Sequence, residues 1–368
     1  MKKRYALIVA FVAGLFGIAP DVQAQNVPFP AQTAPQMGPM IGPTPYGVSP
    51  VGYSAAAAAL HQDGCDDCAV EGWTACNYAY GGFMYLRPRD AEIAYAVPAN
   101  GPIAPGTVAV QAGPVRVLDL DFQPGFFVGF GKFLDECSSF GVQYSNFEGN
   151  TRDAVTVNAP LVVRSLVGHP GTFNGALDGL TASGSQAIQY EMLDFDYRNL
   201  IAYDVDYKIN YLVGLRLTQM EQAFNSTFQF NGTHNVTTDL DFYGAGIRLG
   251  LEGERYTSNG FMVYGKTYAS FIPGEFRADY DQIHSNNVIR VDTAWTAGRL
   301  VTMLDLEVGA GWVSCCGNWR ATVGYTFNSW LNVVQTDEWI KGVQTNNFVD
   351  MTDKMTFDGF IARIEGRW

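Results

Sequence analysis

Pairs of aspartates separated by one residue are the groups in this sequence that most suggest chemistry. There are four such pairs: Asp119 and Asp121, Asp194 and Asp196, Asp204 and Asp206, and Asp239 and Asp241. Residues two apart on a β-strand point to the same side, and neighbouring carboxylates shift each other's pKa, which suits acid–base catalysis or metal binding. No converging base, nucleophile or further ligand is evident in the sequence. We therefore interpret the pairs as charges that line the interior of a β-barrel near the strand ends.

Other charged residues fall on the same alternating faces and are expected to line the same interior. They are Arg216, Arg248, Lys266, Asp305, Glu307, Arg320, Arg363, Glu365 and Arg367. In the expected strand order, Asp305 and Glu307 lie between the strands that carry Lys266 and Arg320. Opposite charges on neighbouring strands stabilise each other, so we expect ion pairs inside the barrel.

Cysteines are the remaining reactive groups, and there are six: Cys65, Cys68, Cys76, Cys137, Cys315 and Cys316. In an exported protein they suggest disulfides. The first three could instead hold zinc, but no second Cys-x-x-Cys pair or two-histidine set completes such a site. The last three fall in turns expected on the periplasmic side. We predict at least one disulfide between the segment 65–76 and a turn of the barrel.

Catalytic motifs are not evident in the sequence. The histidines His61, His169, His234 and His284 are scattered, and no Gly-x-Ser-x-Gly, His-Glu-x-x-His or phosphate-binding loop occurs. A third class of function, a hydrolase embedded in a barrel, therefore has little support. We expect no enzyme activity, no cofactor and no bound metal.

The stretch 356–368 shows the kind of element that must position these charges. Phe360, Ile364 and Trp368 fall on one face of an extended strand, while Arg363 and the charged residues around it fall on the other. An edge strand of a soluble β-sandwich also alternates. A last strand with one apolar face, one charged face and a terminal aromatic is typical of outer-membrane barrels. We expect its apolar residues to be the signal read by the barrel-assembly machinery.

The same alternation predicts ten strands, with twelve as the alternative. The expected strands are 79–88, 115–134 with a kink at Pro124-Gly125, 139–148, two strands within 193–217 that are separated by a break at 208–210, 236–252, 260–282, 288–313, 318–330 and 356–368. The alternation slips near Gly244 to Gly246, which predicts a β-bulge or a wrongly placed strand boundary.

The expected connections differ in length in a regular way. Long ones, at 88–114, 149–186 and 331–355, alternate with short ones, at 135–138, 208–210, 253–259 and 314–317. Short periplasmic turns and longer outer loops characterise transmembrane barrels, and an even strand number returns both ends to the periplasm. The pattern predicts an all-β fold, an antiparallel transmembrane β-barrel, over residues 79–368.

Composition and the first residues agree with export to a membrane. Charged residues make up 16% of the 368 residues and aromatic residues 14%, whereas about 25% charged residues is usual. Residues 1–24 are predicted to be a signal peptide, with Lys2 to Arg4 before an apolar run and Val22-Gln23-Ala24 as cleavage site.

Residues 25–78 are predicted to be a Pro-rich periplasmic linker. The net charge of −13 argues against nucleic acid as a partner.

Several of these segments resemble a known family. Ile209–Ala223 (INYLVGLRLTQMEQA), Asp241–Arg255 (DFYGAGIRLGLEGER), Leu304–Trp330 and the closing Phe357–Phe360 are similar to the pore-forming barrels of the Legionella-type major outer membrane protein family. The resemblance covers about residues 80–368. It departs at Gly366, where such barrels more often carry an aromatic. It implies a porin-like protein of the cell outer membrane, in contact with its lipid.

The expected strand number limits what could pass. About eight strands are just filled by their own side chains, whereas wide channels need about sixteen. We therefore expect a narrow or plugged lumen that passes small solutes or ions, and an excess of inward carboxylate that favours cations. The alternative is a non-conducting surface barrel that binds partners through its loops or tethers the envelope through its N-terminal tail.

Overall fold

The computed structural model describes residues 77–101, 110–135, 137–172, 179–204, 206–229, 232–257, 259–285, 288–349 and 351–368. The predicted signal peptide, the linker and its three cysteines lie outside these residues. Among the described residues, no helix is long and apolar enough to cross a membrane.

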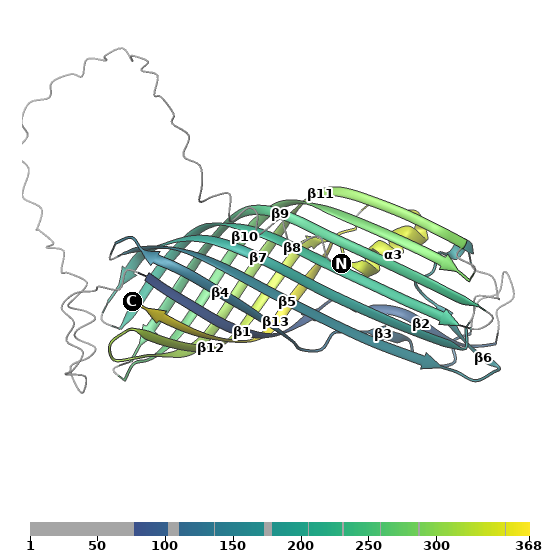
Figure 1. Ribbon diagram of the computed structural model, residues 1–368, viewed down its shortest axis with the longest axis horizontal. Coiled ribbons are helices and arrows are strands. Elements are labelled where there is room, and N and C mark those ends of the chain that lie inside the picture. Colours follow the sequence, from purple (N-terminus) through teal and green to yellow (C-terminus); the bar gives the residue numbers. More distant parts are fainter. Residues whose placement is uncertain are drawn as a thin grey trace, which may run out of the picture. The chain divides into compact units, whose positions relative to one another are not determined.

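Ten antiparallel strands close into a barrel (Figure 1). Around the barrel they are β1 (Asn77–Arg89), β13 (Asp353–Arg367), β12 (Trp319–Val333), β11 (Val288–Val313), β10 (Phe261–His284), β9 (Thr233–Tyr256), β8 (Tyr207–Gln229), β7 (Thr181–Tyr203), β5 (Ser138–Thr156) and β4 (Gln123–Phe133), which pairs with β1. The first and last strands pair along their length, from Tyr78 with Arg367 to Arg89 with Thr356. The predicted ten-stranded antiparallel barrel is confirmed.

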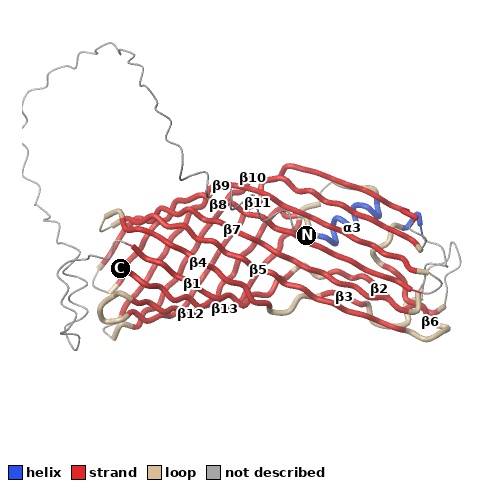
Figure 2. Tube along the Cα trace, in the orientation of Figure 1, coloured by secondary structure: helices blue, strands red, loops and turns tan. Residues whose placement is uncertain are grey.

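Smaller elements occupy the long connections (Figure 2). A separate sheet contains β2 (Ile93–Asn100), β3 (Arg116–Leu118) and β6 (Leu161–Ser165). A 3₁₀ turn, η2, covers Pro170–Thr172, and the helix α3 covers Thr336–Thr345. The long connections lie at one end of the barrel and the short turns 134–137, 204–206, 257–260 and 314–318 at the other. At the first end the connections 230–232 and 285–287 are short as well, so the predicted sorting holds for three of the five connections there. We assign the end that has only short turns to the periplasm.

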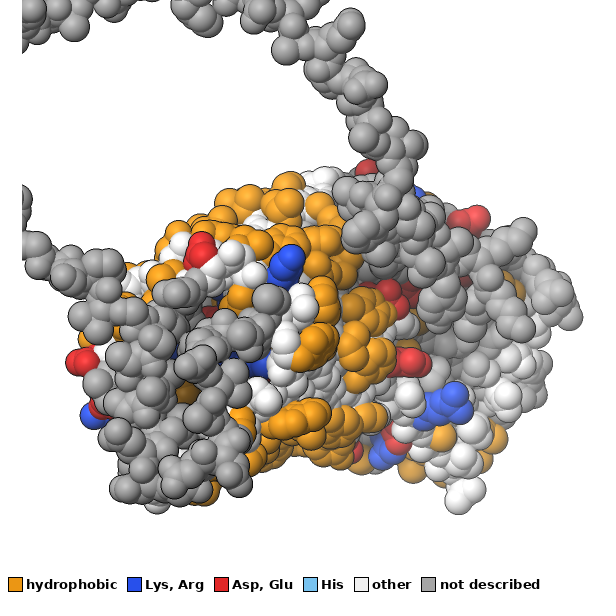
Figure 3. All heavy atoms as spheres, turned by 60° about the vertical axis from the view of Figure 1, so that its left-hand side comes forward, with side chains coloured by type: hydrophobic (Ala, Val, Ile, Leu, Met, Phe, Trp, Pro, Cys, Tyr) orange, Lys and Arg blue, Asp and Glu red, His pale blue; other side chains and the backbone are white. Residues whose placement is uncertain are grey.

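The barrel wall is taller than a bilayer. Strands β7 to β11 contain 23 to 26 residues, whereas about 9–11 tilted residues cross the hydrocarbon core. On β10 the outward face carries no charge from Phe261 to Pro273, and then bears the charged residues Glu275, Arg277 and Asp279. Apolar side chains gather on the wall (Figure 3). The membrane band therefore covers the periplasmic half, and the other half stands above it in water.

The polarity of the barrel interior changes along the barrel in the opposite direction to that of the outer wall. In the membrane band it is charged, whereas above the band it is an apolar core. This core contains Phe147, Tyr190, Met220, Phe224, Phe242, Ile272, Phe276, Tyr280, Val301, Met303, Trp330 and Phe357. Because the extracellular half has water outside, it gains stability by burying apolar side chains inside, as a soluble protein does.

Helix α3 belongs to this core and closes the lumen. We call residues 334–349, which contain it, the plug. Trp339 is fully buried, packs against Trp295 with ring centroids 6.0 Å apart, and donates from Nε1 to the Asp279 carbonyl at 3.3 Å. Gln222 of the wall donates to the Val334 carbonyl at 2.9 Å and accepts from the Thr336 amide at 3.3 Å. Both apolar and polar contacts thus hold the plug against the barrel.

Helix α3 ends where the backbone adopts a left-handed conformation. Asn346 adopts a left-handed conformation with φ 52°, and its amide bonds the Val343 carbonyl, which satisfies the exposed helix end. From the last turn of α3, the side chain of Gln344 donates to the carbonyls of Leu166 and Gly168 at 2.7 and 3.0 Å. The plug is therefore also tied to the loop between β6 and β7.

Three sequence expectations need correction. The bulge predicted near Gly244 is absent from the pairing of β9 with β10, whose register runs unbroken from Phe271 opposite Ile247 to Gly274 opposite Gly244. Even-numbered residues of β9 face inward throughout. The alternation seemed to slip because the interior itself changes, from apolar at Phe242 to charged at Arg248.

The other two corrections concern strand ends. The expected strand 115–134 is divided, because β3 joins the small sheet and the barrel strand β4 begins at Gln123. The break expected at 208–210 lies at 204–206, where the Asp204 amide donates to the Tyr207 carbonyl across the turn at 2.8 Å. β8 therefore begins at Tyr207, four residues earlier than its apolar pattern indicated.

Candidate functional site

A layer of ion pairs crosses the lumen within the membrane band. Arg216 of β8 bonds Asp194 of β7 through Nε and Nη2 at 2.7 and 2.9 Å, and reaches Asp305 of β11 through Nη1 at 2.8 Å. Arg248 of β9 bonds Asp196 at 2.5 Å. The register between the strands sets Asp194 opposite Arg216 and places Asp196 and Arg248 level with each other, on either side of Gly214, so these charges lie close together.

A second layer lies on the periplasmic side of the first. Arg198 bonds Glu252 at 3.1 Å, and the Tyr268 hydroxyl donates to the same carboxylate at 2.6 Å. Lys266 pairs with Glu307 at 2.8 Å. Charge-assisted bonds such as these are the stronger kind, and here they form a connected network around the lumen.

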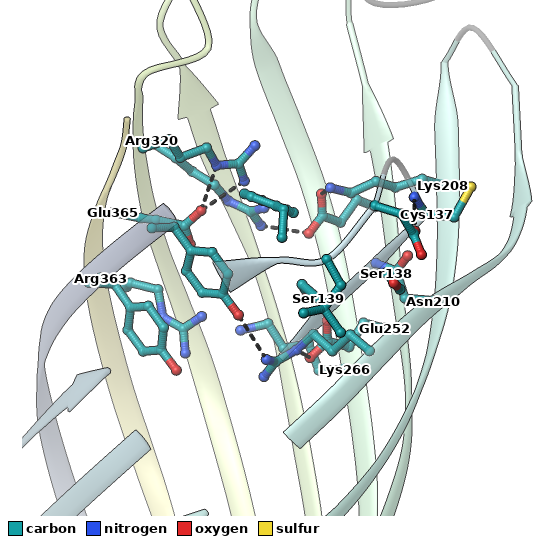
Figure 4. A pocket seen from close by; sticks show the side chains of 18 residues that line it. Cys137, Ser138, Ser139, Lys208, Asn210, Glu252, Lys266, Arg320, Arg363 and Glu365 are labelled. Carbon is teal, nitrogen blue, oxygen red and sulfur yellow. Dashed lines mark hydrogen bonds and ion pairs between the residues drawn. The ribbon is translucent and has the colours of Figure 1, made fainter. Parts of the chain in front are cut away.

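A third group of pairs surrounds the periplasmic mouth. Glu254 accepts from Arg320 at 2.8 Å and from Lys208 at 3.0 Å, while Arg367 pairs with Glu365 at 2.8 Å. Between these side chains lies a cavity of about 330 Å³ (Figure 4). We call it the mouth cavity.

Aromatic rings separate the charged layers from the apolar core. Tyr190 packs against Phe147, Phe357 and Trp330, with ring centroids 5.4, 5.0 and 5.9 Å apart. All four rings are buried. Together with the plug above them, they fill the lumen at the extracellular limit of the membrane band.

These features agree with the comparisons with known proteins. The family model described as Legionella pneumophila major outer membrane protein precursor matches residues 73–364. The chain belongs to this major outer membrane protein family. It is therefore a protein of the outer membrane. No curated protein matches the sequence.

Solved structures similar to this family member are distant. The outer membrane protease OmpT of Escherichia coli has 12% identity and a TM-score of 0.46, over 82% of this chain and 100% of the protease. A FadL homologue of Pseudomonas aeruginosa has 7% identity and a TM-score of 0.25, over 80% of this chain and 90% of the homologue. The toluene transporter TodX of P. putida has 7% identity and a TM-score of 0.29, over 85% and 94%. Similarity at this level carries no information about activity.

The structure brings most of the predicted lumen residues together. Those inside the barrel of this major outer membrane protein are Asp194, Asp196, Arg216, Arg248, Lys266, Asp305, Glu307, Arg320, Arg363, Glu365 and Arg367. The sequence analysis missed Arg198, Lys208, Glu252 and Glu254. Their even numbering on β7, β8 and β9, the same as that of the residues found, was the signal that identifies them.

Six predicted lumen residues lie elsewhere, and two of them, Asp239 and Asp241, are odd-numbered residues on the outward face of β9. Asp119 and Asp121 are exposed in the connection to β4, where Asp119 bonds Arg87 at 2.6 Å. Asp204 and Asp206 lie at the periplasmic turn after β7, and Asp206 pairs with the exposed Arg255. The aspartates at positions 119, 121, 204 and 206 lie at or beyond strand ends, where side chains no longer alternate regularly between the two faces. The alternation along the strands therefore does not place them in the lumen.

The balance of inward charge also differs from the expectation. Basic side chains inside the band are Arg198, Lys208, Arg216, Arg248, Lys266, Arg320, Arg363 and Arg367, and the acidic ones are Asp194, Asp196, Glu252, Glu254, Asp305, Glu307 and Glu365. The basic ones are in slight excess, so the predicted excess of carboxylate is wrong.

The outward residues of the closing strand lie as predicted. Phe360, Ile364 and Trp368 are 62%, 62% and 59% exposed on the barrel wall. Trp312 and Trp319, at the same periplasmic edge, are exposed as well. Aromatic girdles of this kind mark the membrane interface of outer-membrane barrels. Recognition of the closing strand by the assembly machinery stays a prediction.

Histidines and carboxylates do not form a metal site in the part of the chain that is described. His234 and His284 are paired residues of β9 and β10, with ring centroids 5.6 Å apart. They lie in the extracellular half, far along both strands from the ion-pair layers.

Cys137 lies at the rim of the mouth cavity and carries a free, exposed thiol. Cys315 and Cys316 lie in the turn between β11 and β12 at the same end of the barrel. The predicted disulfide with the segment 65–76 involves residues that the structure does not describe, so it stays a prediction.

Labelling of Cys137 tests which end of the barrel faces the periplasm. We expect a membrane-impermeant maleimide to label this thiol only after the outer membrane is permeabilised, because the short turns lie inside. The signal is the labelling of the native protein minus that of the Cys137→Ser variant. Equal labelling of Cys137 in intact cells would reverse the assigned orientation.

Proposed function

We propose that this protein gives passive passage to small solutes or ions through its charged lumen, and that the plug must move for the path to open. The observation that supports the proposal is the charged interior of the membrane band. Buried ion pairs are often no more stabilising than apolar side chains of the same volume. A barrel with a purely structural role would therefore gain little stability from charges that line its interior across the membrane.

The selectivity between cations and anions follows from the same charged side chains. Basic groups slightly outnumber acidic ones among the described inward residues, and nearly all are paired. Strong cation selectivity is therefore not expected. A reversal potential across a potassium chloride gradient measures it directly.

A non-conducting surface barrel is the second candidate. The apolar core and the plug close the extracellular half, and the connections that carry β2, β3 and β6 offer a surface above the membrane. Under this alternative the plug is a permanent part of the core. In neither case do we propose catalysis.

Conductance of the purified protein in planar bilayers separates the two candidates. The informative variant is Trp339→Ala, because it removes the largest side chain that the plug buries. We expect rare openings of the native protein and a several-fold higher open probability for the variant. Lys341→Ala, on the exposed side of the same helix, is the matched control and should behave as the native protein.

If neither the native protein nor Trp339→Ala conducts, while both migrate as folded barrels, the passage proposal fails. The surface-barrel alternative then stands.

Plug opening should depend on pH through Glu338. Burial, followed by the nearby carboxylates of Asp353 and Asp337, raises the pKa of Glu338 to about 7, against a small opposing effect of Arg299. The docked plug thus favours the protonated acid. Its stability is greatest below the usual glutamate pKa of about 4.3 and falls as the pH rises towards about 7. We expect a higher open probability at pH 8 than at pH 5.

Glu338→Gln cannot titrate and should largely remove this pH dependence. The measurement is open probability across the pH range in the same bilayer. An unchanged pH profile in Glu338→Gln would assign the dependence to another group.

A further inference from the structure

The geometry points to an anion-binding site in the mouth cavity, and we propose that it takes a small solute that bears a phosphate group. The cavity has a volume of about 330 Å³, within the range of about 300–1,000 Å³ that is usual for ligand sites. It opens at the periplasmic end of the barrel (Figure 4). The inference goes beyond solute passage, because binding there requires no conducting path.

Charge is the first reason for an anionic ligand. The basic side chains that line the cavity are Arg198, Lys208, Lys266, Arg320, Arg363 and Arg367, whereas the acidic ones are Asp135, Glu252, Glu254 and Glu365. The lining therefore has two more basic than acidic side chains, and one of the basic ones, Lys266, is paired with Glu307 outside the lining. The positive charge that remains favours an anionic ligand such as phosphate.

Arg363 is the second reason, because among the described residues it is the basic side chain of the cavity that has no carboxylate within ion-pair distance. The carboxylates of Glu307 and Glu365 act on its charge only from further away. The other five basic residues each form an ion pair with a carboxylate. Arg363 forms none among the described residues. Its guanidinium lies over the rings of Tyr80 and Phe127, 4.3 and 5.1 Å from their centroids, and donates only to the Gln143 side-chain oxygen at 3.3 Å.

The Nε atom of Arg363 is buried and has no acceptor. A cation left without a partner inside a protein is destabilising, so a bound anion would stabilise this arrangement. Guanidinium groups bind phosphate through two parallel hydrogen bonds. The site is thus completed by an oxyanion rather than by a neutral solute.

Neutral donors add to the site. Ser139 and Asn210 line the cavity on the side away from Arg363 (Figure 4). A hydroxyl and an amide there can hold the phosphate oxygens, or the rest of the solute, without adding charge.

Isothermal titration of the full-length protein in detergent tests the proposal. The probe is inorganic phosphate at low ionic strength. We expect one saturable site per chain, and affinity at least about tenfold lower in Arg363→Gln, since a charge-assisted hydrogen bond is lost. Arg363→Lys keeps the positive charge but loses the two parallel hydrogen bonds, so its affinity should lie between those of the native protein and Arg363→Gln. Asn210→Asp, which adds a negative charge to the wall, should also weaken binding.

Arg255→Gln is the matched control. Arg255 is a basic residue at the same end of the barrel, but it lies outside the cavity and is exposed. The Arg255→Gln variant should bind phosphate as the native protein does. A loss of phosphate affinity as large as that of Arg363→Gln would show that positive charge in general attracts phosphate, and it would overturn the proposed site.

Absence of saturable binding to the native protein, or unchanged affinity in both Arg363→Gln and Asn210→Asp, would also overturn it. Heat-modifiable gel mobility shows whether each variant is folded, and Asn210→Asp serves as the test where Arg363→Gln does not fold. Because no membrane is present, failure here is distinguishable from failure to conduct.

Discussion

Replacing Arg216 by methionine is expected to lower the free energy of unfolding by about 3–5 kcal/mol, the cost of removing one partner from a buried ion pair. Arg216 is 3% exposed and holds Asp194 and Asp305 on opposite sides of the lumen. Without it, two buried carboxylates lose their principal counter-charge. Urea titration of the folded barrel in lipid vesicles measures the change.

A matched variant shows whether burial is the cause. Arg255 pairs with Asp206 at the periplasmic turn, with side-chain exposures of 74% and 46%. Arg255→Met should therefore cost less than about 1 kcal/mol, as exposed pairs do. Adding Asp194→Asn and Asp305→Asn to Arg216→Met should restore part of the loss. A cost below about 1 kcal/mol for Arg216→Met would show that the carboxylates are hydrated or otherwise compensated.

Placing an arginine at Leu306 is expected to destabilise the inserted barrel by about 2–4 kcal/mol, the value for a charge at the bilayer midplane. Leu306 is exposed on the outward face of β11, midway along the apolar run from Leu300 to Trp312. The new side chain would have to reach water from the middle of the hydrocarbon core. Unfolding in vesicles, as above, gives the difference from the native protein.

Thr296 provides the comparison on the same strand and the same face. It is exposed but lies above the apolar run. Thr296→Arg should change stability by less than about 1 kcal/mol, because charges near or above the interface are tolerated. Equal costs for the two variants would mean that the membrane band is placed wrongly on the wall.

Strand number and sidedness were predictable because they depend on local patterns. Side chains of a strand alternate between faces, so the apolar Leu304, Leu306 and Val308 and the charged Asp305 and Glu307 separate without knowledge of any neighbour. Turn lengths are equally local, and they identified the periplasmic end. Most of the lumen residues followed from this alternation.

The plug could not be predicted in this way. Residues 331–355 were expected to form a polar outer loop, and α3 in isolation is short, with two acidic residues in its first turn. Its stability comes from contacts with residues distant in sequence, among them Gln222 and Trp295. Short helices gain most of their stability from such packing.

Charge pairing was predictable only in part for the same reason. Lys266 and Glu307 lie opposite each other on neighbouring strands, so strand order was enough to expect a pair. Arg216 and Asp305 meet across the lumen, which depends on closure of the whole barrel.

The sequence by itself determined the barrel, its strand number and which side of each strand faces inward, because side chains alternate between the two faces of every strand. The tertiary structure decided the position of each inward residue along the barrel axis. That position determines whether the residue lies among the charges of the membrane band or in the apolar core above it. Height depends on the register between strands and on the way the long connections fold inward. Those are long-range interactions, and they close the lumen and leave Arg363 without a carboxylate partner.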